Sequence, residues 1–255
     1  MSPGIPRRRG RPASEGIRAG RRDLSLEERA GYVRRMFSAV APRYDLTNTV
    51  ISAGLHRVWK RETVGALGLR PGERALDLCC GTGDLAYLMV GAVAPGGRVA
   101  GVDFAEPMIA QARRRTIGGR VAFLVADALA LPFSASTFDA AAVGFGLRNV
   151  ADPGQAVAEI RRVLRPGCRL ALLEFARVAN PVVRVLYDLY SFTGLAALGR
   201  LVSGHPDAYT YLPVSVRHWL DQRGVVRLLE DRGFTNVTYR NLAGGIVAVY
   251  SARTP

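Results

Sequence analysis

Residues 76–86 read LDLCCGTGDLA: an apolar run, two cysteines, a Gly-Thr-Gly turn, and an acid that opens an apolar-periodic segment. A strand followed by a glycine-rich turn and a helix is typical of nucleotide-binding α/β proteins. Gly81, Gly83 and Ala86 satisfy the pattern G-x-G-x-x-A, which by itself does not identify the nucleotide. The stretch therefore predicts a cofactor loop and leaves the cofactor open.

The segments around this loop alternate between strand and helix. Strands are predicted at 74–80, 98–104, 121–127, 138–146 and 169–176, and helices at 84–90, 107–115 and 153–164. Strands this apolar predict a parallel sheet that is covered on both faces. The C-terminal segment FTNVTYRNLAGGIVAVYSA holds two runs divided by Gly244-Gly245, which predicts an antiparallel pair. We expect an α/β fold with one doubly wound, mostly parallel seven-stranded sheet and an antiparallel C-terminal hairpin.

The 255-residue chain divides into a tail and one domain. Residues 1–22 hold seven arginines and one glutamate with hardly any apolar residue, which predicts a disordered basic tail. Residues 23–255 form the domain. Within it we expect a helical cap at 23–70, with helices at 26–37 and 55–67 and a loop at 38–45, and a substrate-covering insertion at 177–220. The net charge of +14 favours anionic partners, either nucleic acid or a membrane surface.

The cysteines bear on compartment and metal content. Cys79, Cys80 and Cys168 are an odd number without metal-type spacing, which favours a reduced, cytoplasmic setting and no metal site. Cys79 and Cys80 are adjacent in a predicted strand, so we expect them on opposite faces as small core residues.

Acids at the strand ends discriminate between candidate cofactors. Asp103 ends the second strand twenty-two residues after Gly81, the position of a carboxylate that accepts from ribose hydroxyls. Asp77 and Asp84 flank the loop, where a pyrophosphate would be repelled but a sulfonium and an ammonium would not. Asp84 also suits a helix N-terminus. Asp127 ends the third strand, where it can accept from an adenine amino group. We therefore predict S-adenosylmethionine rather than NAD.

Several longer motifs are more specific than the loop. They are FSAVAPRYDLTN (37–48), SAGLHRVWK (52–60), GFGLRNV (144–150), LEFARVANP (173–181), YDLYSF (187–192), YTYLPVSV (209–216) and RNLAGGIVAV (240–249). With these motifs the chain resembles the ubiquinone/menaquinone biosynthesis C-methyltransferases from about Arg34 to Ser251. That family includes demethylmenaquinone methyltransferases and polyprenyl-benzoquinol methylases. This chain departs from the family's pattern at Cys79-Cys80. It also departs at His218-Trp219, because relatives usually have Pro before the Asp-Gln pair of this segment.

The resemblance implies a class I, Rossmann-like methyltransferase that methylates a ring carbon of a polyprenyl quinol. It places the cofactor contacts on Thr82, Asp103, Asp127 and Ala128. It also includes Gly144, although Ser is frequent there in relatives and any side-chain contact is lost. The implied partner is a lipid-tailed quinol, either a naphthoquinol or a benzoquinol, reached by peripheral contact with the inner face of the membrane.

The candidate catalytic residue is Arg148, which follows the fourth strand. Its guanidinium could stabilise the phenolate that makes a ring carbon nucleophilic, or it could pair with a structural acid. We favour a core or loop position for His56. Four tyrosines could line an aromatic pocket but are also typical of a core: Tyr187, Tyr190, Tyr209 and Tyr211.

The segment 181–202 is apolar but interrupted by charges, so it predicts a packed or membrane-touching helix and not a membrane-spanning one.

Other functions must be compared with quinol methylation. A class I methyltransferase acting on another small molecule or on RNA is the main alternative, although no RNA-binding module is recognisable and we expect no nucleic-acid partner. An NAD oxidoreductase and a non-enzymatic binding module are disfavoured by the acids at the loop.

Overall fold

The computed structural model describes residues 24–115, 119–178, 180–190 and 206–255. Its centre is a seven-stranded sheet in the order β3-β2-β1-β4-β5-β7-β6. The strands are β1 (Arg74–Leu78), β2 (Arg98–Asp103), β3 (Val121–Val125), β4 (Phe138–Gly144), β5 (Leu164–Phe175), β6 (Thr235–Leu242) and β7 (Val247–Arg253). Strands β1 to β5 pair in parallel, whereas β7 is antiparallel to β5 and β6. The predicted fold class is confirmed.

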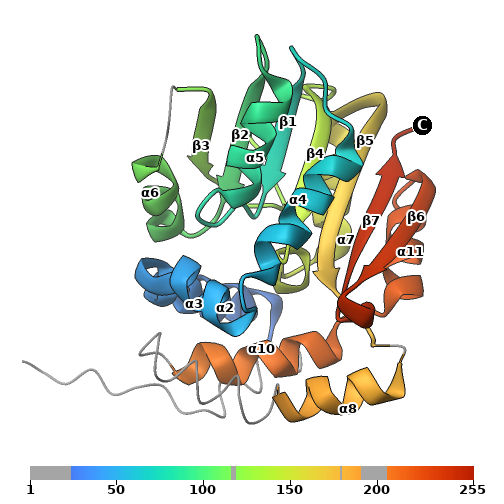
Figure 1. Ribbon diagram of the computed structural model, residues 1–255. Coiled ribbons are helices and arrows are strands. Elements are labelled where there is room, and N and C mark those ends of the chain that lie inside the picture. The colour runs from blue at the N-terminus through green and yellow to red at the C-terminus, as the bar shows by residue number, and fades with distance from the viewer. Residues whose placement is uncertain (1–23, 116–118, 179, 191–205) are drawn as a thin grey trace, which may run out of the picture.

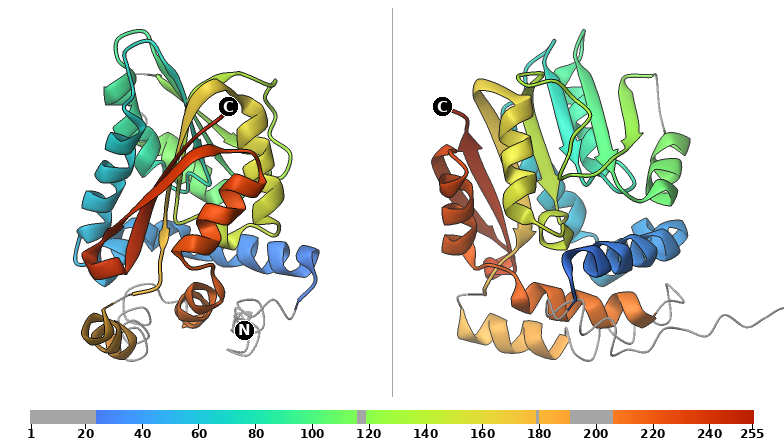
Figure 2. Two further views of the ribbon diagram at one scale, coloured as in Figure 1. Left: turned by 90° about the vertical axis from the view of Figure 1, so that its right-hand side faces the viewer. Right: turned by 180° about the vertical axis from the view of Figure 1, so that it is seen from behind.

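Helices cover both faces of the sheet (Figures 1 and 2). On one face lie α4 (Leu55–Leu67), α5 (Asp84–Val93) and α6 (Glu106–Arg114), and on the other α7 (Pro153–Val163) and α11 (Gln222–Asp231). Each face has its own buried apolar layer, with Met89 and Ile109 in the first and Ile160 and Leu229 in the second. Burial on both sides explains why the parallel strands are apolar at nearly every position.

A further group of helices lies beyond the carboxyl ends of the parallel strands (Figure 1). It comprises α2 (Leu26–Val40), α3 (Tyr44–Ile51), α8 (Pro181–Leu189) and α10 (Pro206–His218). The described residues also form short 3-10 turns: η1 (Ala41–Arg43), η2 (Leu147–Asn149) and η4 (Ala243–Gly245). Open α/β sheets bind ligands at the carboxyl ends of their strands, so these helices cover the expected ligand site.

Three local predictions were wrong. Residues 38–45 are helical and not a loop, because Pro42 stands in the first turn of η1, where its missing N–H is not needed. Strand β5 begins at Leu164, before the predicted Arg169, because Leu164 pairs with Phe138 ahead of an irregularity in the register. Cys79 lies outside β1 in the left-handed region, with φ +56°, because the chain turns there into the glycine loop. The tail at 1–22 and part of the insertion at 177–220 lie outside the described residues.

Candidate functional site

The glycine loop joins β1 to α5 and holds its shape through left-handed residues. Gly81 and Gly83 have φ +53° and +86°. A Cβ at Gly83 would lie 2.7 Å from Phe123 Cζ, so a larger residue would push the loop off β3. Of the two glycines, only Gly81 lines a cavity. Gly83 thus serves the packing of the loop against the sheet.

Asp103 fixes this loop from the end of β2. Its carboxylate accepts from the backbone N–H of Gly81 at 2.9 Å through Oδ2 and from that of Ala105 at 2.9 Å through Oδ1. Only 8% of the residue is exposed, and burial raises the pKa of its carboxyl despite these hydrogen bonds. The exposed part faces a cavity at the carboxyl edge of the sheet.

That cavity, which we call the strand-end cavity, has a volume of about 90 Å³ and joins five of the predicted cofactor residues. They are Gly81, Asp103, Asp127, Ala128 and Gly144, and apolar side chains such as Phe104, Met108 and Leu129 complete the wall. Asp127 is exposed, and its Oδ1 accepts from the N–H of Leu129 at 2.9 Å. Successive strands have brought together residues that are far apart in the sequence, as their positions predicted.

Asp77 does not line this cavity. It is buried in β1, where Oδ2 accepts from the N–H of Ala86 at 2.8 Å in the first turn of α5, and Oδ1 has no partner among the described residues. Burial raises the pKa of its carboxyl to about 8. Asp77 therefore holds the start of α5, and at neutral pH it lacks the full negative charge that we expected to face a cation.

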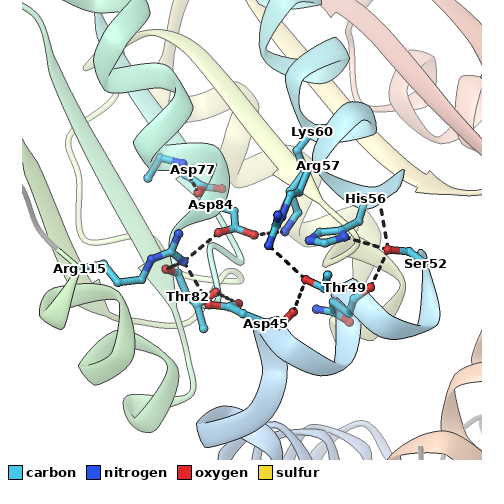
Figure 3. A network of polar contacts seen from close by, with 12 residues as sticks. Asp45, Thr49, Ser52, His56, Arg57, Lys60, Asp77, Thr82, Asp84 and Arg115 are labelled. Carbon is cyan, nitrogen blue, oxygen red and sulfur yellow. Dashed lines mark hydrogen bonds and ion pairs between the residues drawn. The ribbon is translucent and has the colours of Figure 1, made fainter. Parts of the chain in front are cut away.

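Thr82 and Asp84 belong to a polar network on the outer side of the loop (Figure 3). Asp84 pairs with Lys60 at 2.7 Å and with Arg115 at 2.8 Å. Burial alone would raise the pKa of Asp84, but these cations outweigh it and bring the pKa to about 2. The hydroxyl of Thr82 donates to Asp45, which also accepts from Arg115. The network ties α3, α4 and α6 to the loop.

A second and larger cavity, of about 420 Å³, lies under the helical layer, and we call it the aromatic cavity. It shares four wall residues with the strand-end cavity: Phe37, Tyr44, Gly144 and Phe145. The ring of Phe145 stands 6.2 Å from that of Trp59 and 5.0 Å from that of Phe175. The volume of the aromatic cavity is within the range of small-molecule sites.

Arg148 lies in the wall of the aromatic cavity and is also part of a buried ion pair. Its Nη1 donates to Glu174 Oε2 at 3.0 Å and to the carbonyl of Phe145 at 2.6 Å. Arg148 is 6% exposed and Glu174 is fully buried. Burial raises the pKa of Glu174, and the guanidinium opposes this shift. The two alternatives considered for Arg148, a site residue and a structural partner, are thus both compatible with its position.

Comparison with known proteins identifies the family. The sequence model of the ubiE/COQ5 methyltransferase family matches residues 24–253. The chain belongs to this family. A demethylmenaquinone methyltransferase of Beutenbergia cavernae is 46% identical over 221 residues, or 87% of this chain and 90% of the relative. The ubiquinone/menaquinone biosynthesis C-methyltransferase UbiE of Ectopseudomonas mendocina is 41% identical over 240 residues, or 92% and 94% of the two chains.

Solved structures agree with this assignment at the level of the fold. A Thermotoga maritima methyltransferase, described as a possible histamine N-methyltransferase, aligns with a TM-score of 0.62 at 18% identity, over 88% of this chain and all of the other. A Haemonchus contortus phosphoethanolamine N-methyltransferase, solved with S-adenosyl-L-methionine, aligns with a TM-score of 0.58 at 16% identity, over 77% and 52% of the chains. This member of the ubiE/COQ5 family is an S-adenosylmethionine-dependent methyltransferase, and the predictions of class, cofactor and enzyme are confirmed.

The strand-end cavity of this methyltransferase fits that cofactor. Its charged wall residues are Asp103, Asp127 and Arg34, and the last is stacked 5.5 Å over the ring of Phe104. Carboxylate acceptors suit ribose hydroxyls and an adenine amino group, and the apolar wall suits the ring. Apart from Arg34, the charged groups of this wall are carboxylates, and these would repel a diphosphate. The residues present therefore favour S-adenosylmethionine over NAD.

Sequence reasoning missed several polar residues of the aromatic cavity, among them Ser52, His56 and Lys60. His56, which we expected in the core or in a loop, lies in this wall together with Tyr187, Tyr190 and Tyr211. Tyr211 is buried and donates to Asn149 Oδ1 at 3.0 Å, so it also has the core role that we considered. The side chain of Tyr209 lies outside the described residues. The position of His56 in the motif SAGLHRVWK was the available signal.

Proposed function

We propose that this methyltransferase transfers the methyl group of S-adenosylmethionine to a ring carbon of a lipid-tailed hydroquinone. The observation that carries the proposal is the meeting of the two cavities at Gly144 and Phe145. One cavity presents acceptors for an adenosine group, and the other presents apolar and aromatic walls for a ring and the start of a prenyl chain. The relatives named for menaquinone and ubiquinone biosynthesis support a quinol as the substrate class.

The chain's own groups then have defined tasks. The bound cofactor supplies a methyl group on a sulfonium, the electrophile for an electron-rich ring. Asp103 accepts from the ribose hydroxyls, while Asp127 accepts from the adenine amino group. Phe145, with the ring of Trp59 against it, excludes water where the cavities meet. Arg148 Nη2 has no hydrogen-bond partner among the described residues and can donate to a ring oxygen, which stabilises negative charge as it develops there.

The assay for this proposal uses purified protein with S-adenosylmethionine labelled in the methyl group. The acceptors are a short-chain demethylmenaquinol, a demethylated benzoquinol, and unmodified RNA as the control. We expect the label on a ring carbon of at least one quinol, detected by mass spectrometry, and none on RNA. Transfer to RNA, or to neither quinol, would refute the proposed function. Comparison of the two quinols decides which ring is preferred.

We further propose that α8 rests on the membrane surface that holds the lipid-tailed quinol. Its exposed apolar residues recur on one face of the helix, each 60–67% exposed: Val182, Val185, Leu186 and Leu189. Tyr187 of α8 and Tyr190, the C-cap residue of this helix, line the aromatic cavity, so the helix that carries the apolar face also borders the proposed substrate site. Arg184 is exposed on this helix and suits anionic lipid headgroups.

None of the described helices is sufficiently long and apolar to span a bilayer. The cytoplasmic location stays a prediction.

Leu186→Glu is expected to weaken binding to vesicles of phosphatidylcholine and phosphatidylglycerol about tenfold or more. Burying a leucine side chain in lipid contributes about 1.5–3 kcal/mol, and the added carboxylate is repelled by the anionic surface. Tyr239→Glu is the matched control, because Tyr239 is exposed on β6, away from α8. Co-sedimentation measures both variants. Equal binding by the two variants would exclude α8 as the contact.

A further inference from the structure

His56 occupies the second position of α4 and is 6% exposed. It lines the aromatic cavity together with Ser52 and Asn48, which precede α4 in the chain. A buried histidine normally satisfies both ring nitrogens. Here only Nδ1 is satisfied, by the hydroxyl of Ser52 at 2.8 Å (Figure 3). Nε2 has no hydrogen-bond partner among the described residues, and it is not among the fully enclosed polar atoms, so it is open to the cavity.

The neighbouring hydrogen bonds determine which nitrogen carries the proton. Ser52 Oγ lies 2.6 Å from the carbonyl oxygen of Asn48, which can only accept, so the single hydroxyl proton is directed there. Toward His56, Ser52 Oγ can therefore only accept, and Nδ1 must be the donor. A neutral imidazole with its proton on Nδ1 presents a lone pair at Nε2. The lone pair faces the space where the quinol ring is proposed to lie.

We propose that His56 is the general base of the reaction, and that Nε2 accepts the hydroxyl proton of the quinol as its ring carbon attacks the methyl group. This inference rests on the proposed function. The ring carbon forms the new C–C bond while the S–CH₃ bond breaks, and that electron pair stays on sulfur. The proton on the methylated ring carbon then leaves to solvent, and Nε2 returns its proton to the ring oxygen. One proton is released in total, which balances the loss of the sulfonium charge.

The charges around the ring keep the imidazole in its accepting form. Burial lowers the pKa of His56 to about 4, and Lys60 and Arg57 on the same helix act in the same direction. Asp84 of α5 and Asp45 of α3 oppose them. Arg148 lines the same cavity and can stabilise the ring oxygen as it loses its proton. As the ring carbon gives its electrons to the methyl group, the ring hydroxyl becomes more acidic. Nε2 therefore need not be a strong base in the free protein.

The test compares two quinols that differ in the acidity of the hydroxyl: a short-chain demethylmenaquinol and its analogue fluorinated on the distal ring, assayed at a pH where only the analogue is ionised. His56→Gln keeps an acceptor of similar reach but cannot take a proton. We expect this variant to lose about 10²–10⁴-fold in single-turnover rate with the ordinary quinol. The loss should shrink tenfold or more with the ionised analogue, which has no proton to give. His218→Gln, on the exposed end of α10, should behave as the wild type.

Two results would overturn the assignment of His56 as the general base without refuting the proposed function. One is a wild-type rate for His56→Gln, and the other is the same loss with both quinols, which a purely structural histidine would produce. Titration with S-adenosylmethionine and the melting temperature verify that the variant is folded. Failure of the wild type to methylate both the demethylmenaquinol and the demethylated benzoquinol would instead refute the proposed function, and this inference with it.

Discussion

Arg148→Met is expected to lower the free energy of unfolding by about 3–5 kcal/mol, because it leaves Glu174 buried and without its cation. The second substitution Glu174→Gln should restore most of this loss. The amide removes the unpaired charge and keeps one acceptor oxygen, for the backbone N–H of either residue 148 or Phe175, while its NH₂ group meets the other N–H. Chemical denaturation of the wild type, the single variant and the double variant measures the effect. A single variant as stable as the wild type would show that the pair does not matter for the fold.

The stabilised double variant then separates structure from chemistry. Without the guanidinium, the developing negative charge on the ring oxygen loses a donor, and removal of one such donor costs about 10²–10³-fold in rate. We expect the double variant to lose on the order of a hundredfold in single-turnover rate while its affinity for S-adenosylmethionine changes little. Arg148→Lys should fall between it and the wild type, since it keeps the charge but loses the planar fork. A folded double variant with normal turnover would remove Arg148 from the mechanism.

The pairing of Arg148 with Glu174 shows why the sequence could place a residue but not its partner. The strand pattern located Arg148 after β4 at the ligand edge, and this position was correct. Its partner stands on β5, and only the parallel register that sets Gly144 beside Leu173 brings the two side chains together. Such a register is a tertiary property, because it depends on the packing of both faces of the sheet.

His56 and Asp84 illustrate a second limit. The role of His56 depends on a proton position, which follows from two hydrogen bonds at the break between α3 and α4 and not from residue types. The charge of Asp84 was visible in the sequence, but its neutralisation by Lys60 and Arg115 was not. By contrast, Asp103, Asp127 and Gly144 were predictable, because the carboxyl ends of parallel strands converge at one edge whatever the details of packing.

Asp103→Asn is expected to weaken S-adenosylmethionine binding at least tenfold. A carboxylate that accepts from both ribose hydroxyls contributes two charge-assisted hydrogen bonds of about 1.5–3 kcal/mol each. Asn retains the shape but has one acceptor oxygen, and its NH₂ group meets the N–H of either Gly81 or Ala105. The substitution Asp103→Ala would remove both loop bonds as well and is less informative. Calorimetric titration measures the affinity, and the melting temperature monitors the loop.

The coupling between Asp103 and the ribose is tested with S-adenosylhomocysteine and its 2′-deoxy and 3′-deoxy analogues. In the wild type, removal of a hydroxyl bound by Asp103 should cost roughly tenfold or more in affinity, since the buried carboxylate loses a donor. In Asp103→Asn the same removal should cost much less, because the charge-assisted bond is already gone. Asp127→Asn is the control and should show the wild-type cost for either hydroxyl, since Asp127 is assigned to the adenine. If removing a hydroxyl lowered the affinity of Asp103→Asn and of the wild type by the same factor, Asp103 would only hold the loop in place. The ribose hydroxyls would then donate to other acceptors along the strand-end cavity.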